Sequence, residues 1–188
     1  MARDQDLAGK RFLAVIAPRN FRDEELFEPR AALEARGAKV TVASTGTEAA
    51  KGMLGGVAQP HATIDACRMD DFDAVFVVGG MGSPTFLWEN QDLHRLLRDA
   101  QERGKPIGGI CLSGAVLAKA GVLKGKRATV YRTDASIQSL RAGGAIYVGE
   151  SLVADGRIVT GDGPQIARSF AQKLGDIVVK LGAAVAAE

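Results

Sequence analysis

Cys111 is the side chain of this sequence best placed to do chemistry, because an apolar strand pattern over 106–110 ends at it and a helical pattern begins at 113. The first N–H groups of a helix are unpaired and carry partial positive charge. They therefore lower the pKa of a nearby thiol and can hold a developing oxyanion. A cysteine can equally be a small buried hydrophobe. The glycines around this junction favour a nucleophile in a tight strand-to-helix turn.

Four carboxylates near the start of the chain supply candidate proton donors and acceptors: Asp23, Glu24, Glu25 and Glu28. The pattern predicts a helix over 23–37 whose acidic first turn is mostly a solvated face. A carboxyl group that points towards Cys111 would accept the thiol proton or donate a hydrogen bond to the sulfur. Burial beside an anion would raise its pKa and keep it protonated. Spacing alone leaves both roles open.

The stretch VVGGMGS, residues 77–83, brings paired glycines to the end of another apolar strand pattern. Glycines at such a place let backbone N–H groups approach a ligand, although a tight turn with no other role explains them equally well. The spacing of Gly80 and Gly82 resembles a dinucleotide-binding loop only superficially, since the third glycine is misplaced and no matching acidic residue follows. We therefore expect no cofactor.

Histidine is scarce, and both histidines precede Cys111. We predict His61 in a loop and His94 on the surface of a helix, so no imidazole is expected beside the thiol, where a cysteine–histidine pair would need one. The second thiol, Cys67, has no flanking glycine or strand end, and we interpret it as structural. No spacing of cysteine, histidine and carboxylate suggests a metal site.

The elements that must position these residues alternate along the chain. Strands are predicted at 10–18, 38–44, 73–80, 105–111, 126–131 and 145–149, with a hairpin over 151–162; helices are predicted at 23–37, within 83–104, and at 113–121, 134–144 and 163–182. Nearly all-apolar strands in this alternation indicate a mostly parallel sheet covered on both faces. Such sheets bind ligands outside the carboxyl ends of their strands, which is where Cys111, Gly79 and Gly80 fall.

Length and charge predict a single ordinary globular domain over 1–188. The chain has 188 residues, and 24 basic side chains against 22 acidic ones leave a net charge of +2, so no nucleic-acid partner is expected. No apolar run approaches the ~20 residues of a membrane span. The first residues are polar and lack the apolar core of a signal peptide. We expect a cytoplasmic protein with no membrane partner and with free thiols.

The stretch GKPIGGICLSGAVLAKAGVLKGKRATVY, residues 104–131, resembles a run typical of the ThiJ/PfpI (DJ-1/PfpI) superfamily. The stretch FRDEELFEPRAALEARGAKV, 21–40, is similar to the first helix of that family, and DAVFVVGG, 73–80, to its glycine loop. The resemblance implies a flavodoxin-like three-layer α/β/α sandwich of the class I glutamine amidotransferase type. It also implies a homodimer or a higher homo-oligomer.

By matched position, the resemblance implies that Cys111 is the nucleophile and Glu25 a protonated carboxyl at its sulfur. It further implies that backbone N–H groups of three residues bind an oxyanion: Gly79, Gly80 and Leu112. Tyr131 is implied to line the pocket.

The sequence also departs from the family pattern. Leu112 stands where peptidase-like relatives have histidine, and Ser113 with Gly114 replaces the usual Gly-Pro. Peptide hydrolysis therefore lacks a visible proton shuttle. The downstream histidine of amidotransferases is missing as well.

The resemblance implies, as the leading hypothesis, a cofactor-independent glyoxalase or deglycase-like enzyme of the stress response, which acts on small reactive carbonyls such as methylglyoxal. It needs one nucleophile and one carboxyl acid/base, both of which the chain offers. The alternative is a non-catalytic cysteine redox sensor or chaperone. A PfpI-type intracellular peptidase or an isocyanide hydratase-like enzyme fits the residues less well.

Overall fold

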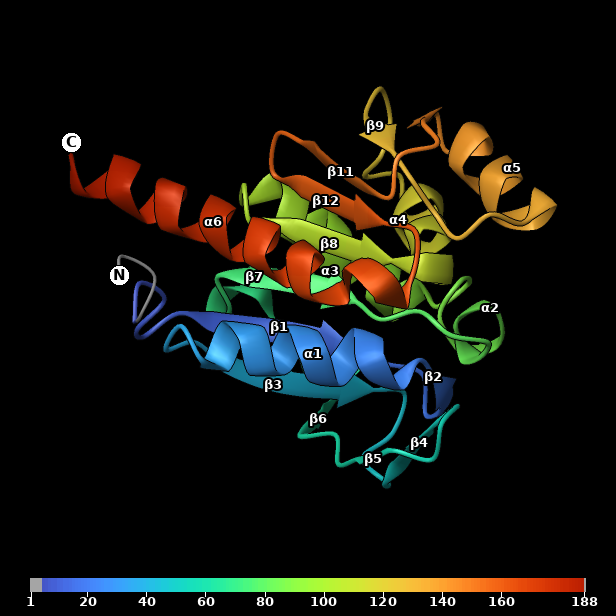
Figure 1. The fold of residues 1–188 in the computed structure, drawn as a ribbon, viewed down its shortest axis with the longest axis horizontal. Coiled ribbons are helices and arrows are strands. Elements are labelled where there is room, and N and C mark those ends of the chain that lie inside the picture. The colour runs from blue at the N-terminus through green and yellow to red at the C-terminus, as the bar shows by residue number, and fades with distance from the viewer. Residues whose placement is uncertain (1–4, 188) are drawn as a thin grey trace.

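A seven-stranded sheet forms the centre of the molecule in the computed structural model, which describes residues 5–187 (Figure 1). Its strands lie in the order β11-β12-β8-β7-β1-β3-β6, and all neighbours are parallel except β11 and β12. The strands are β1 Arg11–Val15, β3 Lys39–Ser44, β6 Ala62–Thr63, β7 Ala74–Val77, β8 Ile107–Ile110, β11 Leu152–Asp155 and β12 Ile158–Gly161. The predicted mostly parallel sheet is confirmed, as is the hairpin at its edge.

Helices cover both faces of this sheet, which confirms the three-layer α/β/α sandwich. On one face α1 (Asp23–Glu34) packs against α6 (Ala167–Ala186), as Figure 1 shows. The other face carries α3 (Gln91–Glu102) and α4 (Gly114–Ala120), with α5 (Asp134–Ala142) packed on α4. Because side chains alternate along a strand, each strand contributes to both layers.

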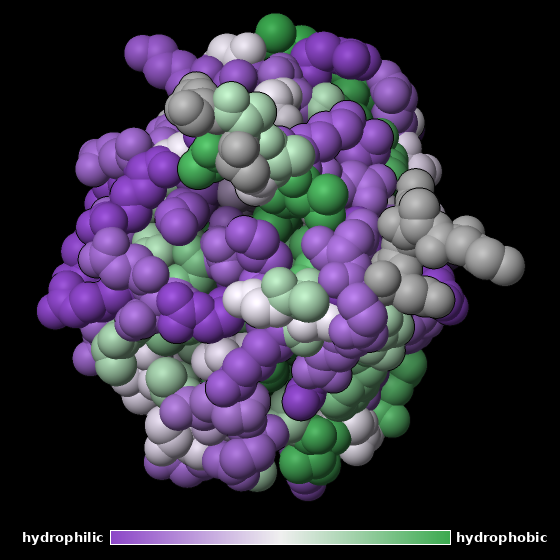
Figure 2. All heavy atoms as spheres, turned by 90° about the vertical axis from the view of Figure 1, so that its left-hand side faces the viewer, coloured by the Kyte–Doolittle hydropathy of each residue, from purple (hydrophilic) through white to green (hydrophobic). Residues whose placement is uncertain are grey.

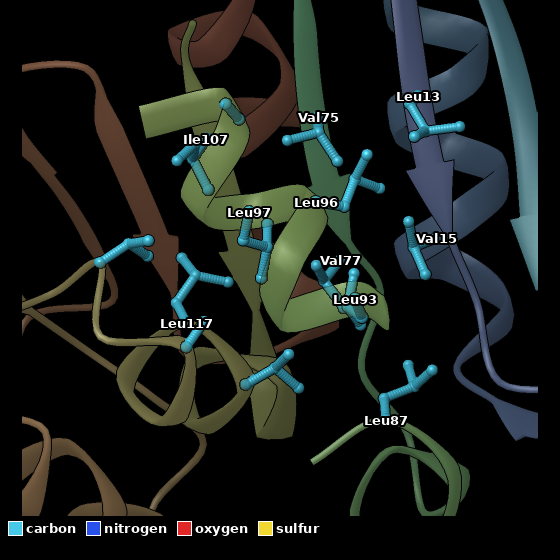
Figure 3. Packing of buried hydrophobic residues seen from close by; sticks show 14 of the residues in the cluster. Leu13, Val15, Val75, Val77, Leu87, Leu93, Leu96, Leu97, Ile107 and Leu117 are labelled. Atoms are coloured by element: carbon cyan, nitrogen blue, oxygen red, sulfur yellow. The ribbon is translucent and has the colours of Figure 1, made fainter. Parts of the chain in front are cut away.

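Two apolar clusters fill the spaces between the sheet and its helices. In β1, Phe12 belongs to the cluster under α1 and α6, whereas its neighbour Leu13 belongs to the cluster under α3 and α4. Figure 3 shows the second cluster, in which leucines of α3 point towards strand side chains: Leu93, Leu96 and Leu97 from the helix, and Val75, Val77 and Ile107 from β7 and β8. The amphipathic pattern of α3 thus fixes which of its faces meets the sheet.

The strand that ends at Cys111 is rich in glycine because both helix layers approach it closely. A Cβ atom on Gly108 would lie 2.5 Å from Cζ of Phe170 in α6, and one on Gly109 would lie 2.9 Å from a methyl carbon of Leu117 in α4. Real side chains do not pack at such distances, so larger residues in β8 would push the layers apart. The glycines let β8 run through the core and reach Cys111 at its carboxyl end.

A second, three-stranded sheet borders the carboxyl end of the main sheet, in the order β2 (Arg19–Phe21), β4 (Ala50–Gly52) and β5 (Val57–Ala58). Asp23, at the start of α1, accepts hydrogen bonds from the N–H groups of Leu54 (2.8 Å) and Gly56 (2.6 Å) in the β4–β5 turn. Asp23 is buried. The expectation of a solvated acidic face is therefore wrong for this residue, which holds a turn.

Several local predictions need correction. The segment 83–104 contains two helices, α2 (Gly82–Phe86) and α3, and Asn90 caps α3 by accepting a hydrogen bond from Leu93 N–H. The strand predicted at 126–131 is reduced to β9 (Arg127–Ala128), which pairs with β10 (Ile146–Tyr147) outside the main sheet. The remaining elements are 3-10 turns: η1 Ile64–Ala66, η2 Met69–Asp71, η3 Cys111–Ser113 and η4 Pro164–Ile166.

The end of the molecule that carries both termini lies opposite the carboxyl ends of the strands (Figure 1). Figure 2 views this end, where hydrophilic residues surround a smaller hydrophobic area. Leu181 and Val185 of α6, with Lys10 and Arg157, line part of a cavity of about 490 Å³ there. Within residues 5–187, no helix has the length and apolar character needed to cross a membrane.

Replacing Gly108 by alanine should destabilise the fold, because the new methyl group would have to displace the buried ring of Phe170. Overpacking of this kind costs about 1–3 kcal/mol of the free energy of unfolding, which urea denaturation measures. Gly149→Ala is the matched control, since nothing lies within 4 Å of a Cβ atom at that position. Equal stability of the two variants would contradict the close packing of β8.

Candidate active site

Cys111 occupies a strained turn at the junction of β8 and η3. Its φ angle is +57°, in the left-handed region that side chains other than glycine rarely adopt, which costs of order 1–3 kcal/mol. The carbonyl oxygen of Cys111 accepts a hydrogen bond from the N–H of Tyr131 (3.1 Å), and the residue is only 6% exposed. The tight strand-to-helix turn predicted from the glycine-rich sequence is present.

Glu25 reaches this turn from the first turn of α1 and is fully buried. Its Oε2 accepts a hydrogen bond from the N–H of Gly79 (2.9 Å), and its side chain interacts with that of Cys111. Its Oε1 has no conventional hydrogen-bond partner among the described residues, although it is buried. A Cβ atom on Gly79 would lie 2.6 Å from Cβ of Cys111 and 2.7 Å from Oε2 of Glu25. The absence of a side chain at position 79 therefore lets carboxyl and thiol meet.

Both the carboxyl of Glu25 and the thiol of Cys111 have a raised pKa. Burial raises the pKa of Glu25 to about 7, against the opposing effect of its hydrogen bonds with Cys111 and Gly79. Burial, followed by the negative charge of Glu25, raises the pKa of Cys111 to about 12. The expectation of a lowered thiol pKa at a helix start is wrong here, because desolvation of the sulfur and the neighbouring carboxylate outweigh the N–H groups. Below a pH of about 7 both groups are protonated; above it Glu25 is ionised while the thiol keeps its proton, so the Glu25 carboxylate is the group that can take that proton from sulfur.

Two backbone N–H groups face the sulfur, those of Gly80 and Leu112, and both act to lower the pKa of the thiol. Gly80 has a φ angle of +101°, and a Cβ atom there would lie 2.4 Å from the backbone nitrogen of Arg22. Glycine is thus required for this close approach. Gly79 was expected to contribute to the same oxyanion site, but its N–H is engaged by Glu25. The available pair consists of Gly80 and Leu112.

The side chain of Tyr131 is 48% exposed and lines a cavity of about 380 Å³, with Thr129, Tyr147, Asp162 and Gln165 among its other lining residues. Cys111 itself does not line this cavity. The backbone of Tyr131, by contrast, touches the cysteine turn directly through its hydrogen bond to Cys111. The structure therefore places the backbone of Tyr131 against the cysteine turn and its ring in a separate cavity, so the pocket role that the resemblance implies for this residue stays a prediction.

The histidines lie away from the thiol. His94, predicted on a helix surface, is only 3% exposed: its Nε2 lies 2.8 Å from the carbonyl oxygen of Trp88, and burial lowers its pKa. His61 lies in a loop, as predicted, and its Nδ1 accepts a hydrogen bond from Val42 N–H. Cys67 is buried with its sulfur 3.4 Å from the carbonyl oxygen of Thr63, which fits a structural role. The described part of the chain contains no group of three or more His, Cys, Asp or Glu side chains that could hold a metal ion.

Sequence reasoning missed several groups that support the cysteine turn. Arg22 acts electrostatically on both Glu25 and Cys111 from the residue before α1. The indole N–H of Trp88 donates to the carbonyl oxygen of Leu112 (3.0 Å). The buried hydroxyl of Ser113 also bonds within this region. Only Ser113 carried a signal in the sequence, since a serine there replaces the glycine of the pattern that the chain resembles.

A family model, described as the DJ-1/PfpI family, matches residues 10–176. The chain belongs to the DJ-1/PfpI family. Its sequence is 44% identical over 166 residues to an uncharacterised protein of Methanocaldococcus jannaschii, which covers 88% of this chain and 81% of that protein. It is 32% identical to the protein dj-1beta of Drosophila melanogaster, over 89% of this chain and 88% of that one.

Solved structures of the DJ-1/PfpI family have the same fold. A ThiJ/PfpI domain protein from Brachyspira murdochii superposes with a TM-score of 0.84 at 34% identity, and the match covers 90% of this chain and 98% of that one. Among further relatives is the deglycase of Thermococcus kodakarensis, 29% identical over 80% of this chain and 89% of that protein. The family and its flavodoxin-like fold are thus established, and the family includes proteins named deglycase and DJ-1.

The raised pKa of Glu25 predicts how stability depends on pH. The folded state binds more protons than the unfolded state between pH 4.5 and about 7, so stability falls as pH rises through this window, by about 3 kcal/mol in full. Glu25→Gln cannot ionise and keeps an oxygen for the N–H of Gly79. It should therefore gain stability relative to the natural protein between about pH 5 and about pH 8 in urea denaturation.

The control for this prediction is Glu28→Gln, which changes an exposed carboxylate on the same helix and should leave the pH dependence unchanged. If Glu25→Gln and the natural protein had parallel stability–pH curves, Glu25 would not carry a raised pKa.

Proposed function

We propose that this chain acts through Cys111 as a cofactor-independent enzyme on small reactive carbonyls, in the manner of a glyoxalase or deglycase. The observation that carries the proposal is the contact between the fully buried carboxyl of Glu25 and the thiol in its strained turn. Several relatives in the family are named deglycases, which supports the same class of substrate. Nucleophile and base are both supplied by side chains of this chain.

The first step is addition of the thiol to an aldehyde such as that of methylglyoxal. The Glu25 carboxylate takes the thiol proton while sulfur forms a bond to the aldehyde carbon, and the carbonyl oxygen receives the electron pair. The N–H groups of Gly80 and Leu112 stabilise the negative charge on that oxygen. Transfer of the proton from Glu25 to the oxygen completes a hemithioacetal and restores the carboxylate.

The second step is an isomerisation within the bound adduct. Glu25 removes the hydrogen of the carbon bonded to sulfur as a proton; the electron pair forms a double bond to the neighbouring carbon, and the ketone oxygen takes the negative charge of the enediolate. The proton of the hydroxyl group then passes to that oxygen, and the same carboxyl returns its proton to the neighbouring carbon, which gives a thioester of lactate. Water then hydrolyses the thioester, so that lactate leaves and the thiol is regenerated. One carboxyl group with a pKa near neutrality suits both directions of proton transfer.

The proposal predicts that the purified protein forms lactate from methylglyoxal above the buffer background. Cys111→Ser should reduce this rate to background, because the hydroxyl is a far weaker nucleophile at neutral pH than a thiol beside a base. Glu25→Gln should lower kcat by about 10²-fold or more, since it removes the proton acceptor. Enzymatic determination of lactate measures both effects.

Cys67→Ser is the matched control, because Cys67 is also buried and is not part of the site. It should keep full activity. Lactate formation that survives Cys111→Ser, or no lactate from the natural protein, would refute the proposed reaction.

A redox role of Cys111 is the second candidate, favoured by the unpaired Oε1 of Glu25. When protonated, this carboxyl can donate a hydrogen bond to an oxygen atom on sulfur, and the N–H groups of Gly80 and Leu112 can bind further oxygen. Two equivalents of peroxide are required: each transfers one oxygen atom to sulfur and leaves as water, which converts the thiolate to a sulfinate.

Mild peroxide treatment separates the two candidates. A sensor should gain the mass of two oxygen atoms on the peptide that contains Cys111, stably and without any carbonyl turnover. Cys67, a buried thiol outside the site, serves as the internal comparison and should gain no such mass. Mass spectrometry of the intact protein and of its peptides gives the answer. An unchanged mass at Cys111 would count against sensing.

The wider setting of the proposed enzyme also stays a prediction. We propose that it functions as a homodimer or a larger homo-oligomer in the cytoplasm, with a small carbonyl compound as its substrate and with no metal or organic cofactor in the reaction. Sedimentation of the purified protein tests the proposed oligomeric state.

A further inference from the structure

Two buried serines connect the turn that carries Cys111 to the glycine loop that faces it. The Oγ atom of Ser113 lies 2.7 Å from the carbonyl oxygen of Val78 and 2.7 Å from Oγ of Ser83, and both serines are 0% exposed. A carbonyl oxygen only accepts hydrogen bonds, so Ser113 uses its single hydroxyl hydrogen on Val78. Ser83 must then donate to Ser113. The bonds form a chain with one direction, from Ser83 through Ser113 to Val78.

The ends of this chain lie on either side of the loop that supplies one of the N–H groups at the sulfur. Val78 directly precedes Gly79 and Gly80, and Ser83 follows them. The N–H of Ser83 also donates to the carbonyl oxygen of Gly80 (3.0 Å). The Gly80 loop is thereby held at both ends by groups in the hydroxyl chain.

The middle of the chain belongs to the segment that supplies the other N–H group. Ser113 is the last residue of η3, immediately after Cys111 and Leu112. The two N–H groups at the sulfur thus come from segments about 30 residues apart in sequence, for which Ser113 is a direct hydrogen-bonded link. A hydrogen bond weakens steeply as its geometry departs from the optimum, so the relative position of these segments matters.

We propose that Ser83 and Ser113 are positioning residues that keep the N–H groups of Gly80 and Leu112 directed at the Cys111 sulfur. The inference rests on the proposed function, in which this sulfur is the reacting atom. The positive φ angle of Cys111 stores strain that the turn would release by moving. The buried hydroxyl chain opposes that movement, because breaking it would leave polar groups without partners in the core.

Loss of the chain should make the thiolate harder to form. The two N–H groups act to lower the pKa of the thiol, so their displacement raises it. Each unit of pKa lowers the thiolate fraction tenfold at a given pH. The charged groups that act on the thiol are Glu25 and Arg22, and neither changes in the serine variants.

The test is the rate of alkylation of Cys111 by iodoacetamide as a function of pH, followed on the Cys111 peptide by mass spectrometry. Ser113→Ala should slow the reaction about 3- to 10-fold at neutral pH, as expected for a rise of up to about one pKa unit. Ser83→Ala should have a smaller effect of the same sign, since the bond from Ser113 to Val78 remains. Because Ser83 acts only through Ser113, the double variant should match Ser113→Ala.

Ser44→Ala is the matched control, because Ser44 is an equally buried serine whose hydroxyl donates to a backbone carbonyl, that of Ile16, at 2.8 Å. It should lower stability while leaving the alkylation profile unchanged. If Ser113→Ala does not fold, Ser83→Ala decides the question alone.

The outcomes separate the inference from the proposed function. Serine variants whose profiles coincide with that of the natural protein would overturn the positioning role and leave the proposed reaction intact. Inertness of the natural protein at every pH would overturn both, since the sulfur would then not be a nucleophile. Carbonyl turnover is not measured, so a failure to form lactate leaves the result on the serines standing.

Discussion

The meeting of Glu25 and Cys111 depends on Gly79 having no side chain. A Cβ atom there would lie within 2.7 Å of both groups, so any other residue would force the carboxyl and the thiol apart. The same residue uses its N–H to hold Oε2 of Glu25. One glycine thus gives the carboxyl both the space beside the sulfur and the hydrogen bond that orients it. Burial raises the pKa of both groups, and the negative charge of Glu25 raises that of the thiol further.

The fold carries this arrangement because three parallel strands end near one place. The segments that follow β1, β7 and β8 supply Glu25, the glycine loop and Cys111. All-apolar strands alternating with amphipathic helices predict a buried parallel sheet, and the carboxyl ends of such strands share one edge. The class of fold and the edge of the sheet that carries the candidate site could therefore be predicted from the sequence. The identity of Cys111 and Glu25 came from the glycine-rich junction together with the family resemblance.

Other features could not be predicted from the sequence because they depend on burial rather than on residue type. The predicted fall in the thiol pKa used only the helix start, whereas desolvation of the sulfur and the neighbouring carboxylate act in the opposite direction and prevail. His94 was placed on a surface because a polar residue on a helix is usually solvated, yet a carbonyl oxygen of Trp88 satisfies it in the core. Asp23 similarly holds a turn that is distant in sequence. Hydrogen-bond partners of this kind leave no periodic pattern in the sequence.

The proton chemistry available at Cys111 limits what the site can catalyse. Neither histidine of the chain lies against the sulfur in the described structure, so Glu25 is the one side chain in contact with it that can both accept and donate a proton near neutrality. Hydrolysis of a peptide requires protonation of a departing amine some distance from the attacking sulfur, for which a second acid is usual. Isomerisation of a hemithioacetal moves one proton between adjacent carbons, and a single carboxyl can do this. The number of proton carriers at Cys111 therefore supports the proposed carbonyl chemistry over proteolysis.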